Sequence, residues 1–191
     1  MIPEEVLKIL GEKGAILRGH FQLSSGRHSD TYLQCAMVCQ YPDVTNALAR
    51  ELAIPHQKSE VNVVITPAIG GIILGYAVAQ FLGCRMVFAE RERKKLSLRR
   101  GFSIKAGEKV LVVEDVVTTG GTIKEMIDLV KGYGGEVIGV ASLIDRSEDE
   151  VFEKPLHSLV KMKIKSYSSE DCPLCKRGIP ISIPGSRGII K

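Results

Sequence analysis

The sequence predicts an α/β protein of one domain, built on a parallel β-sheet that is covered by helices on both faces. Short apolar segments rich in β-branched residues alternate along the chain with segments of helical spacing. The apolar segments are continuous, which is typical of strands that are buried on both sides. Three of these predicted strands end in polar or glycine-rich turns, and parallel sheets bind ligands beyond such strand ends. A length of 191 residues fits about one domain.

The N-terminal part of the chain predicts two helices with a strand-rich segment between them. Residues 3–13 have apolar side chains at helical spacing, and Pro3 stands where the first turn of a helix tolerates proline. Residues 15–34 favour short strands and turns, interrupted by the polar sequence at 24–27. An amphipathic helix is expected over 42–54, because Val44, Leu48 and Leu52 share one face.

The rest of the chain alternates strands with helices. Four apolar segments are predicted strands, at 61–65, 85–89, 110–113 and 137–144. Helices are expected over 72–82 and 122–133, and Gly134 and Gly135 end the second of them. A strongly charged segment, 90–101, follows the second strand. In the tail, 151–191, apolar and polar residues alternate briefly near 159–164. The tail ends in a Gly/Pro-rich stretch that we expect to be irregular.

The composition excludes several classes of protein. Hydrophobic residues make up 45% and charged residues 25% of the chain, which speaks against a disordered or fibrous protein. No apolar run reaches the roughly 20 residues of a membrane span, and the N-terminus lacks the pattern of a signal peptide. We therefore expect a cytoplasmic protein without a membrane partner. The net charge of +4 is a mild basic excess that suits anionic small molecules.

The most informative segment is a strand that ends in two carboxylates and a glycine-rich turn. Glu114 and Asp115 directly follow the apolar run 110–113, and the turn 118–122 opens the next helix. Backbone N–H groups, Thr hydroxyls and the positive end of that helix favour a phosphate. The carboxylates suit sugar hydroxyls or a divalent cation, so the pattern predicts a site for a ribose 5-phosphate. The alternative, a plain turn with a Thr cap, needs no paired carboxylates.

This segment resembles the phosphoribosyl pyrophosphate (PRPP) motif of type I phosphoribosyltransferases. Three further segments resemble orotate phosphoribosyltransferases: a signature at 21–29 followed by Tyr32, a pyrophosphate loop at 66–71 and a strand end at 143–146. The likeness covers roughly residues 15–150. It implies the type I phosphoribosyltransferase fold, with a parallel-sheet core flanked by helices and a small N-terminal hood. The whole chain, 1–191, would be one domain with its core at about 41–150 and its hood formed by about 1–40 and the C-terminal tail.

The resemblance implies a role for each matching residue. Arg146 is expected to pair with the carboxylate of orotate, and Thr118 to lie near the base as well. Asp115 is expected to hold the ribose hydroxyls together with Glu114 and to contribute to catalysis. The remaining PRPP-binding residues are Val116, Val117, Thr118, Thr119, Gly120, Gly121 and Thr122. The segment that faces the pyrophosphate consists of Ala68, Ile69, Gly70 and Gly71. Mg²⁺ is the expected cofactor, held mainly through PRPP and not by a protein metal site.

The charged segment 90–101 corresponds in place to a mobile loop that the family closes over its active site, often from the neighbouring subunit. The resemblance therefore implies a homodimer that shares this loop across the interface. Its cations are expected to stabilise the departing pyrophosphate, and Arg91, Lys94 and Lys95 are the catalytic candidates. The segment lacks the His of the better-known pattern, and Ser24 stands where the N-terminal signature often has Lys. The alternative interpretation is a solvated charged face.

The cysteines predict no metal site within one chain. Cys172 and Cys175 form a single Cys-x-x-Cys, whereas a structural zinc site needs four ligands. Neither a second Cys-x-x-Cys nor a His-x₃₋₅-His exists, so we expect two reduced thiols; two subunits that pool their pairs are the alternative. The histidines receive no catalytic role: His20, His28, His56 and His157.

These observations together predict an enzyme that joins orotate to PRPP, giving orotidine 5′-monophosphate and pyrophosphate in UMP synthesis. A purine phosphoribosyltransferase of the adenine type is the alternative within enzymes, although a purine has no carboxylate for Arg146. A PRPP-sensing regulator is a second alternative, but about 15 residues before the first signature are too few for a helix-turn-helix module. We expect no nucleic-acid partner; RNA binding through 91–100 would be strongly salt-dependent.

Overall fold

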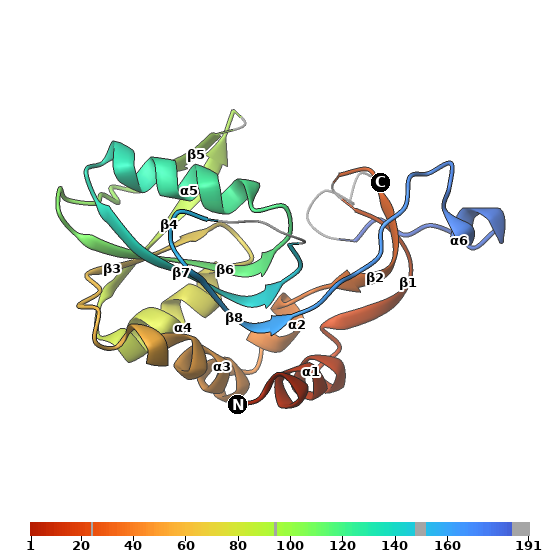
Figure 1. Cartoon of the computed structure of the whole chain (residues 1–191), viewed down its shortest axis with the longest axis horizontal. Coiled ribbons are helices and arrows are strands. Elements are labelled where there is room, and N and C mark those ends of the chain that lie inside the picture. The colour runs from red at the N-terminus through yellow and green to blue at the C-terminus, as the bar shows by residue number, and fades with distance from the viewer. Residues whose placement is uncertain (24, 94, 148–151, 185–191) are drawn as a thin grey trace.

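The computed structural model of this chain describes residues 1–23, 25–93, 95–147 and 152–184. A six-stranded sheet forms the centre, with the spatial order β5-β4-β3-β6-β7-β8 (Figure 1). Five neighbouring strands run parallel, and β5 returns antiparallel to β4 at one edge. The strands are β3 (Val63–Pro67), β4 (Arg85–Glu92), β5 (Lys95–Leu98), β6 (Lys109–Val117), β7 (Glu136–Asp145) and β8 (Leu156–Lys161).

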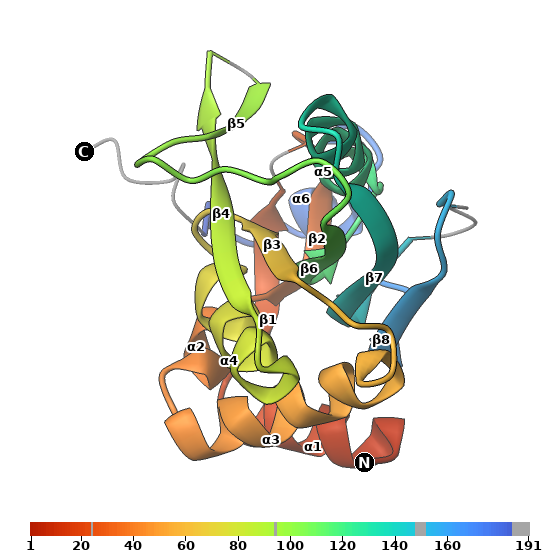
Figure 2. The ribbon, with the colours of Figure 1, turned by 90° about the vertical axis from the view of Figure 1, so that its left-hand side faces the viewer.

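Helices cover both faces of the sheet, as the continuous apolar strands require. The helices α1 (Pro3–Glu12), α3 (Pro42–Ala53) and α4 (Ile72–Leu82) lie against one face, and α5 (Gly121–Gly132) lies against the other (Figure 2). The apolar side chains of β6 divide between the two layers: Leu111 packs in the first cluster and Val112 in the second. Two short helical segments, α2 (Ala36–Cys39) and η1 (Ile54–His56), flank α3. None of the described helices combines the length and apolar character that a membrane span requires.

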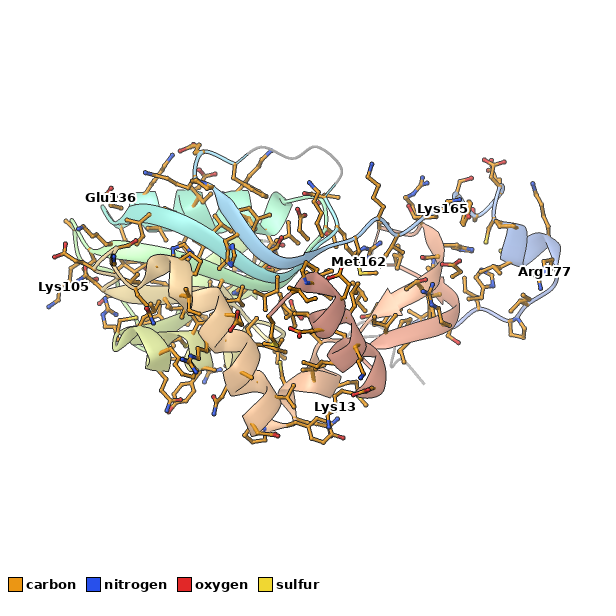
Figure 3. All side chains as sticks on the ribbon, turned by 60° about the horizontal axis from the view of Figure 1, so that its bottom comes forward. Lys13, Lys105, Glu136, Met162, Lys165 and Arg177 are labelled. Carbon is orange, nitrogen blue, oxygen red and sulfur yellow. The ribbon has the colours of Figure 1, made fainter. Side chains whose placement is uncertain are left out.

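A small hood stands beside the sheet. Its centre is an antiparallel hairpin of β1 (Ile16–Gln22) and β2 (His28–Leu33) (Figure 1). The tail borders both edges of this hairpin, because His28 N–H donates to the Tyr167 carbonyl (2.9 Å) and Gln22 N–H donates to the Ser182 carbonyl (2.9 Å). Between these contacts lies the short helix α6 (Pro173–Lys176). Figure 3 shows this course of the tail, from Met162 beside the sheet past Lys165 to Arg177 in the hood.

Most predicted elements are present, and their differences have physical causes. The helix expected at 72–82 has those bounds, and the other three predicted helices are placed to within one residue. The strand expected to end at Val113 continues to Val117, because β6 pairs with β7 as far as Val117 opposite Asp145. The carboxylates therefore lie within a strand and not after it. The elements α2, η1, β5 and α6 had no clear local signal, and the alternation near 159–164 indicated only part of β8.

The division into core and hood differs from the expected one. The helix α1 packs with the core layer, since Val6 and Leu10 are fully buried in one cluster with Leu48 and Leu52 of α3. The strand β8 lies beyond residue 150 but extends the central sheet through its parallel pairing with β7. The hood is therefore the hairpin together with the tail after β8.

The packing of α4 against β3 depends on a glycine. A Cβ atom added to Gly75 would lie 2.0 Å from Cγ2 of Thr66, which is fully buried in β3. No side chain fits at this distance without movement of helix or strand. The absence of a side chain at Gly75 therefore allows α4 to approach the strand that leads to the 68–71 turn.

We predict that Gly75→Ala lowers the free energy of unfolding by about 1–3 kcal/mol, the usual cost of overpacking a core. The matched control is Gly132→Ala in α5, where an added Cβ meets nothing within 4 Å, and which we expect to be neutral or stabilising. Thr66→Ser removes the clashing methyl group, so it should recover much of the loss in the double variant. Urea unfolding measures the free energy of unfolding of the wild type, Gly75→Ala, Gly132→Ala and the double variant. Equal stability of Gly75→Ala and wild type would contradict the packing argument.

Candidate functional site

Three turns meet at the carboxyl edge of the parallel sheet. They follow the adjacent strands β3, β6 and β7, as the residues 68–71, 118–120 and Arg146. Arg146 N–H donates to the Val117 carbonyl (2.8 Å), which joins the ends of β7 and β6. A Cβ atom on Gly70 would lie 2.8 Å from Oδ2 of Asp115, so the 68–71 turn passes directly beside the carboxylate of β6. The structure thus brings together the three segments that the sequence singled out.

The two carboxylates of β6 have different surroundings. Glu114 is 8% exposed, and burial together with the neighbouring Asp115 raises its pKa well above the ordinary value for a glutamate. Asp115 is half-buried, and its Oδ1 accepts a hydrogen bond from Val116 N–H (2.9 Å). Burial therefore favours the neutral form of Glu114, while Asp115 faces the open side of the site. The pair presents oxygen atoms that suit sugar hydroxyls or a hard cation.

The turn 118–122 has the geometry of an anion site. Gly120 has a φ of +74°, the left-handed conformation that glycine adopts readily, and α5 starts at the next residue. The first helical hydrogen bond runs from Lys124 N–H to the Gly120 carbonyl (3.0 Å). The N–H groups before Lys124 therefore have no acceptor within the helix, and they lie at its positive end. Thr118 and Thr119 are exposed and add hydroxyl groups.

Two residues assigned to PRPP binding have packing roles in this structure. Val117 is buried in the cluster beneath α5, and Val116 packs against the cluster on the opposite face. Thr122 is half-buried in the first turn of α5, and Gly121 is exposed beside it. Of the segment 116–122, the exposed residues are therefore Thr118, Thr119 and Gly121, and the two valines hold the beginning of the turn in place.

The 68–71 turn is short and contains two glycines. Ala68 N–H donates to the Ala89 carbonyl (2.8 Å), and the Ala68–Ile69 peptide bond is cis. The side chain of Ile69 is 79% exposed and points away from the core. An added Cβ on Gly71 would lie 2.9 Å from Thr66 Oγ1, so both glycines of this turn occupy places that a side chain would fill. The two glycines therefore let the backbone of this turn pack closely against Asp115 and Thr66.

Arg146 has unused hydrogen-bonding capacity. Its side chain is half-buried, burial lowers the pKa of the guanidinium, and its Nε is buried without a hydrogen-bond partner. The adjacent Asp145 accepts hydrogen bonds from Ser147 N–H (2.8 Å) and Ser147 Oγ–H (2.6 Å) and approaches Lys161 (3.7 Å). In the described part of the chain, no carboxylate pairs with Arg146. A ligand carboxylate fits this donor, since guanidinium binds such groups through two parallel hydrogen bonds.

The charged segment differs from the expected loop, because β4 continues to Glu92 and turns back as β5. Arg91 makes a two-point ion pair with Glu125 of α5 (2.9 and 3.2 Å), and Glu125 also accepts a hydrogen bond from Leu96 N–H (2.8 Å). Leu96 is buried beneath α5, so cross-strand pairing and burial both order the hairpin. Lys95 is exposed at the start of β5. Lys94 and Ser24 lie outside the described residues.

The hood faces the carboxylates. Burial and the charge of Asp115 raise the pKa of Tyr32 on β2. Burial, Asp115 and Glu114 likewise raise the pKa of the Cys35 thiol just after β2. The sequence offered Tyr32 only as part of a signature without a role. Its place beside Asp115 results from the packing of hood on core, which no local pattern reveals.

Comparisons with known proteins agree with this architecture. The model of the phosphoribosyl transferase domain family matches residues 42–168. The orotate phosphoribosyltransferase of Caldanaerobacter subterraneus subsp. tengcongensis is 56% identical over 188 residues, 98% of this chain and 99% of the relative. The crystal structure of orotate phosphoribosyltransferase from Aeropyrum pernix has a TM-score of 0.70 at 28% identity, covering 82% of this chain and 93% of that one. Adenine phosphoribosyltransferase from Rhodothermus marinus, at 24% identity and a TM-score of 0.66 over 83% and 99%, shares the fold.

We predict that the free energy of unfolding falls as the pH rises through the window above the ordinary glutamate pKa of about 4.3. The raised pKa of Glu114 means that the folded protein holds a proton there that the unfolded chain has released. Glu114→Gln should therefore be more stable than wild type at about pH 8, and this difference should shrink toward pH 4. Urea unfolding at several pH values measures it. Glu12→Gln, an exposed site at the end of α1, is the control, and a pH-independent difference for Glu114→Gln would contradict the burial argument.

Proposed function

This chain belongs to the phosphoribosyl transferase domain family, and we propose that it is an orotate phosphoribosyltransferase. It transfers the ribose 5-phosphate of PRPP to orotate, giving orotidine 5′-monophosphate and pyrophosphate, a step of UMP synthesis. The observation that carries this assignment is the 56% identity to an orotate phosphoribosyltransferase over 98% of the chain. The unpaired donor of Arg146 supports the choice of an acidic base, and a purine would leave it without a carboxylate.

Two turns and the carboxylates of β6 have complementary roles in binding PRPP in this proposal. The 118–122 turn binds the 5-phosphate through backbone N–H groups at the start of α5 and through the Thr118 and Thr119 hydroxyls. Glu114 and Asp115 accept hydrogen bonds from the ribose hydroxyls. The backbone of the 68–71 turn, which passes beside Asp115, faces the pyrophosphate. One ligand would thus span the distance between two adjacent strand ends.

The reaction is a substitution at the anomeric carbon of the ribose. A ring nitrogen of orotate forms the new bond to this carbon while the bond to the pyrophosphate oxygen breaks, and the electron pair of that bond leaves with pyrophosphate. The protein aligns the two substrates and stabilises the charge that develops on the leaving group. No covalent bond to a protein side chain is needed. The Arg146 guanidinium holds the orotate carboxylate and so orients the attacking nitrogen.

Mg²⁺ fits the oxygen donors of this site. The Asp115 carboxylate faces the 68–71 turn, and hard cations prefer oxygen ligands of this kind. We propose that the cation arrives mainly on PRPP and that it supplies charge neutralisation for the pyrophosphate. Asp115 is the residue that would face it.

Basic residues of the β4–β5 hairpin are proposed to assist the departure of pyrophosphate. Arg91 is held by Glu125 in this structure, so its direct action on pyrophosphate requires that this ion pair opens. Lys95 is exposed, its charge helps to lower the pKa of Glu125, and Lys94 precedes it in the sequence. We therefore retain Arg91, Lys94 and Lys95 as candidates.

A homodimer that shares the segment 90–101 across its interface is the proposed assembly. Helix α4 exposes large apolar side chains, among them Ile73 and the 66% exposed Tyr76, next to the exposed Ile69. An apolar helix face of this kind favours association with another protein surface. A cytoplasmic location is also proposed, and the five free cysteines support it, since cytosolic thiols stay reduced.

We predict that Arg146→Ala raises the KM for orotate at least tenfold and changes the KM for PRPP little. The reason is the loss of hydrogen bonds to a charged group, each of which contributes about 1.5–3 kcal/mol. Asp115→Asn is the reciprocal variant and should impair the use of PRPP more than that of orotate. Steady-state kinetics with Mg²⁺, and a parallel assay with adenine as the base, measure both effects. Equal losses for both substrates in Arg146→Ala would refute its assigned role.

We predict complementation between Lys95→Ala and Arg146→Ala when the two inactive or weakened proteins are co-expressed. If the hairpin acts across the interface, each mixed dimer contains one site with both defects and one site with neither. Activity should then recover to roughly one quarter of the wild-type value, because half of the dimers are mixed and half of their sites are intact. Separately purified and freshly mixed proteins are the control. No recovery in a confirmed mixed dimer would place the hairpin in the site of its own subunit.

A further inference from the structure

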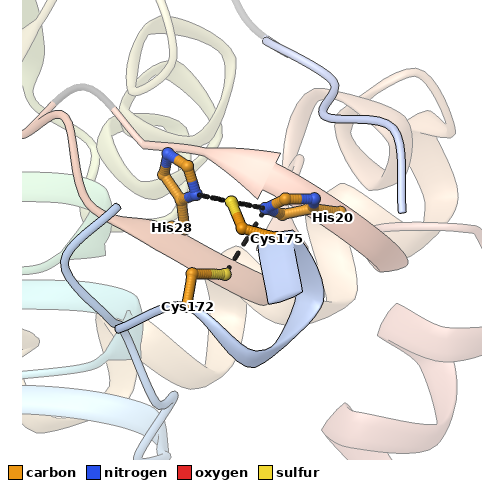
Figure 4. A group of neighbouring side chains, drawn as sticks. All are labelled: His20, His28, Cys172 and Cys175. Carbon is orange, nitrogen blue, oxygen red and sulfur yellow. Dashed lines mark hydrogen bonds between the residues drawn. The ribbon is translucent and has the colours of Figure 1, made fainter. Parts of the chain in front are cut away.

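A second cluster of chemically active side chains lies in the hood, apart from the three turns. It consists of His20 on β1, His28 at the start of β2, and Cys172 and Cys175 on either side of the first turn of α6 (Figure 4). One ligand atom from each residue can be chosen so that all four atoms lie within 4.8 Å of one another. These residues come from segments about 150 positions apart in the chain.

The sequence contains no second ligand pair of the expected spacing for Cys172 and Cys175, but the structure places two histidines beside them. The expected spacing is that of two histidines three to five residues apart, as for ligands on one helix. Here His20 and His28 belong to two paired strands, and the hairpin fold brings their side chains together across the strands. The tail then places α6 against the same face. Only the tertiary structure creates this set.

Four of the six distances among these atoms are close to the edges of a tetrahedral metal site, and the other two lie within 4.8 Å. Zinc bonds of about 2.3 Å to sulfur and 2.0–2.1 Å to nitrogen give tetrahedron edges of about 3.3–3.8 Å. His20 Nε2 lies 3.1 Å from His28 Nδ1, 3.5 Å from Cys172 Sγ and 3.7 Å from Cys175 Sγ. Cys175 Sγ lies 3.3 Å from His28 Nδ1. These separations agree with the edges of a tetrahedron to within a few tenths of an ångström.

The hydrogen bonding of His20 prepares it as a ligand. Its Nδ1 lies 2.7 Å from the Ile179 carbonyl, which can only accept, so the proton of the neutral ring is on Nδ1. The lone pair of Nε2 therefore points into the cluster. A metal-ligating histidine usually donates its other N–H to a carbonyl or carboxylate in this way.

Hydrogen bonds alone do not satisfy this cluster. Three atoms, from His28, Cys172 and Cys175, converge on the single lone pair of His20 Nε2. Cys172 is fully buried, and His20 and His28 are only 3% and 6% exposed, so water has little access to them. One divalent cation would satisfy all four atoms at once. With two thiolates it would also form a neutral unit, which suits a site with three buried ligands and the exposed Cys175 at its border.

The hood has a physical need for such a cross-link. A two-stranded hairpin is marginally stable in water, and small units commonly rely on a metal or a disulfide. The described tail is held to the hairpin by backbone hydrogen bonds at Tyr167 and Ser182. Side-chain hydrogen bonds from Arg27 to Ser166 and from Ser29 to the Lys165 carbonyl add to them. The cysteines are free thiols, and no disulfide supplies the link. The cluster lies between the two backbone contacts, where a metal would fasten the tail to both strands.

We propose that His20, His28, Cys172 and Cys175 bind one structural Zn²⁺ that fastens the C-terminal tail to the β1–β2 hairpin. Two sulfur and two nitrogen ligands in tetrahedral geometry select zinc among the common divalent metals. Four protein ligands leave no open coordination position, so the site holds structure and does not activate water. The β2 strand that begins at His28 continues to Tyr32 beside Asp115, and the metal therefore anchors the far end of the strand that covers the active site.

Metal content of the untagged, reduced protein tests this proposal. Purified without chelators after expression with added zinc, the wild-type chain should contain one Zn²⁺ by mass spectrometry of the metals. Removal by a chelator should lower the melting temperature by several degrees, and one equivalent of Zn²⁺ but not of Mg²⁺ should restore it. Co²⁺ added to the metal-free protein should give the visible absorption bands of a tetrahedral thiolate site.

Variants assign the metal to this cluster. Cys172→Ser and Cys175→Ser should each lose most of the zinc, whereas Cys84→Ser, which removes a thiol of the core, should keep it. His28→Cys should retain metal as a Cys₃His site, so it separates loss of a ligand from failure to fold. Reduced wild-type protein that takes up no zinc overturns the proposal without any variant. Zinc content unchanged in both Cys172→Ser and Cys175→Ser, or a Cys172–Cys175 disulfide in the native protein, would do so as well.

Discussion

The approach of the 68–71 turn to Asp115 is the contact on which the site depends. A side chain at Gly70 would reach the carboxylate, so the backbone of one strand end and the acid of the next share a single surface. The parallel pairing of β3, β6 and β7 brings about this approach, and the hydrogen bond from Arg146 N–H to Val117 extends it to the third turn. A ligand that spans phosphate, ribose and pyrophosphate needs this continuity, because its phosphate and ribose meet the end of β6 and its pyrophosphate meets the turn after β3.

The same arrangement places two carboxylates side by side, one of them buried. Burial and the neighbouring Asp115 both oppose the ionisation of Glu114, so the folded chain without ligand carries an electrostatic cost there. Sites that bind charged or polyhydroxyl ligands often contain such energetically unfavourable groups. Hydrogen bonds or cations that arrive with the ligand offset this unfavourable free energy. Arg146 shows the opposite case, since its buried Nε lacks a partner within the described chain. The carboxylates of β6 and the guanidinium after β7 thus both have capacity for complementary groups of a ligand.

The hood, formed by the β1–β2 hairpin and the tail, has little hydrophobic core of its own. Its hairpin covers the carboxylates through Tyr32, yet its other end is held by the tail and not by a core of its own. The cluster of His20, His28, Cys172 and Cys175 lies at that other end. A cross-link there would limit the motion of the hairpin from a place distant from the reacting atoms, so the stability of the hood would influence access to the site.

The sequence by itself determined the strand–helix alternation, the bounds of α4 and the turns that carry the site, because apolar periodicity, glycines and paired acids are local signals. It did not reveal that β6 continues past its carboxylates, that β8 joins the sheet, or that Arg91 is held by Glu125. Only the tertiary structure decided these features and the convergence of His20, His28, Cys172 and Cys175. Strand pairing and packing join residues far apart in the chain, and the energy of such contacts depends on neighbours that no local pattern contains.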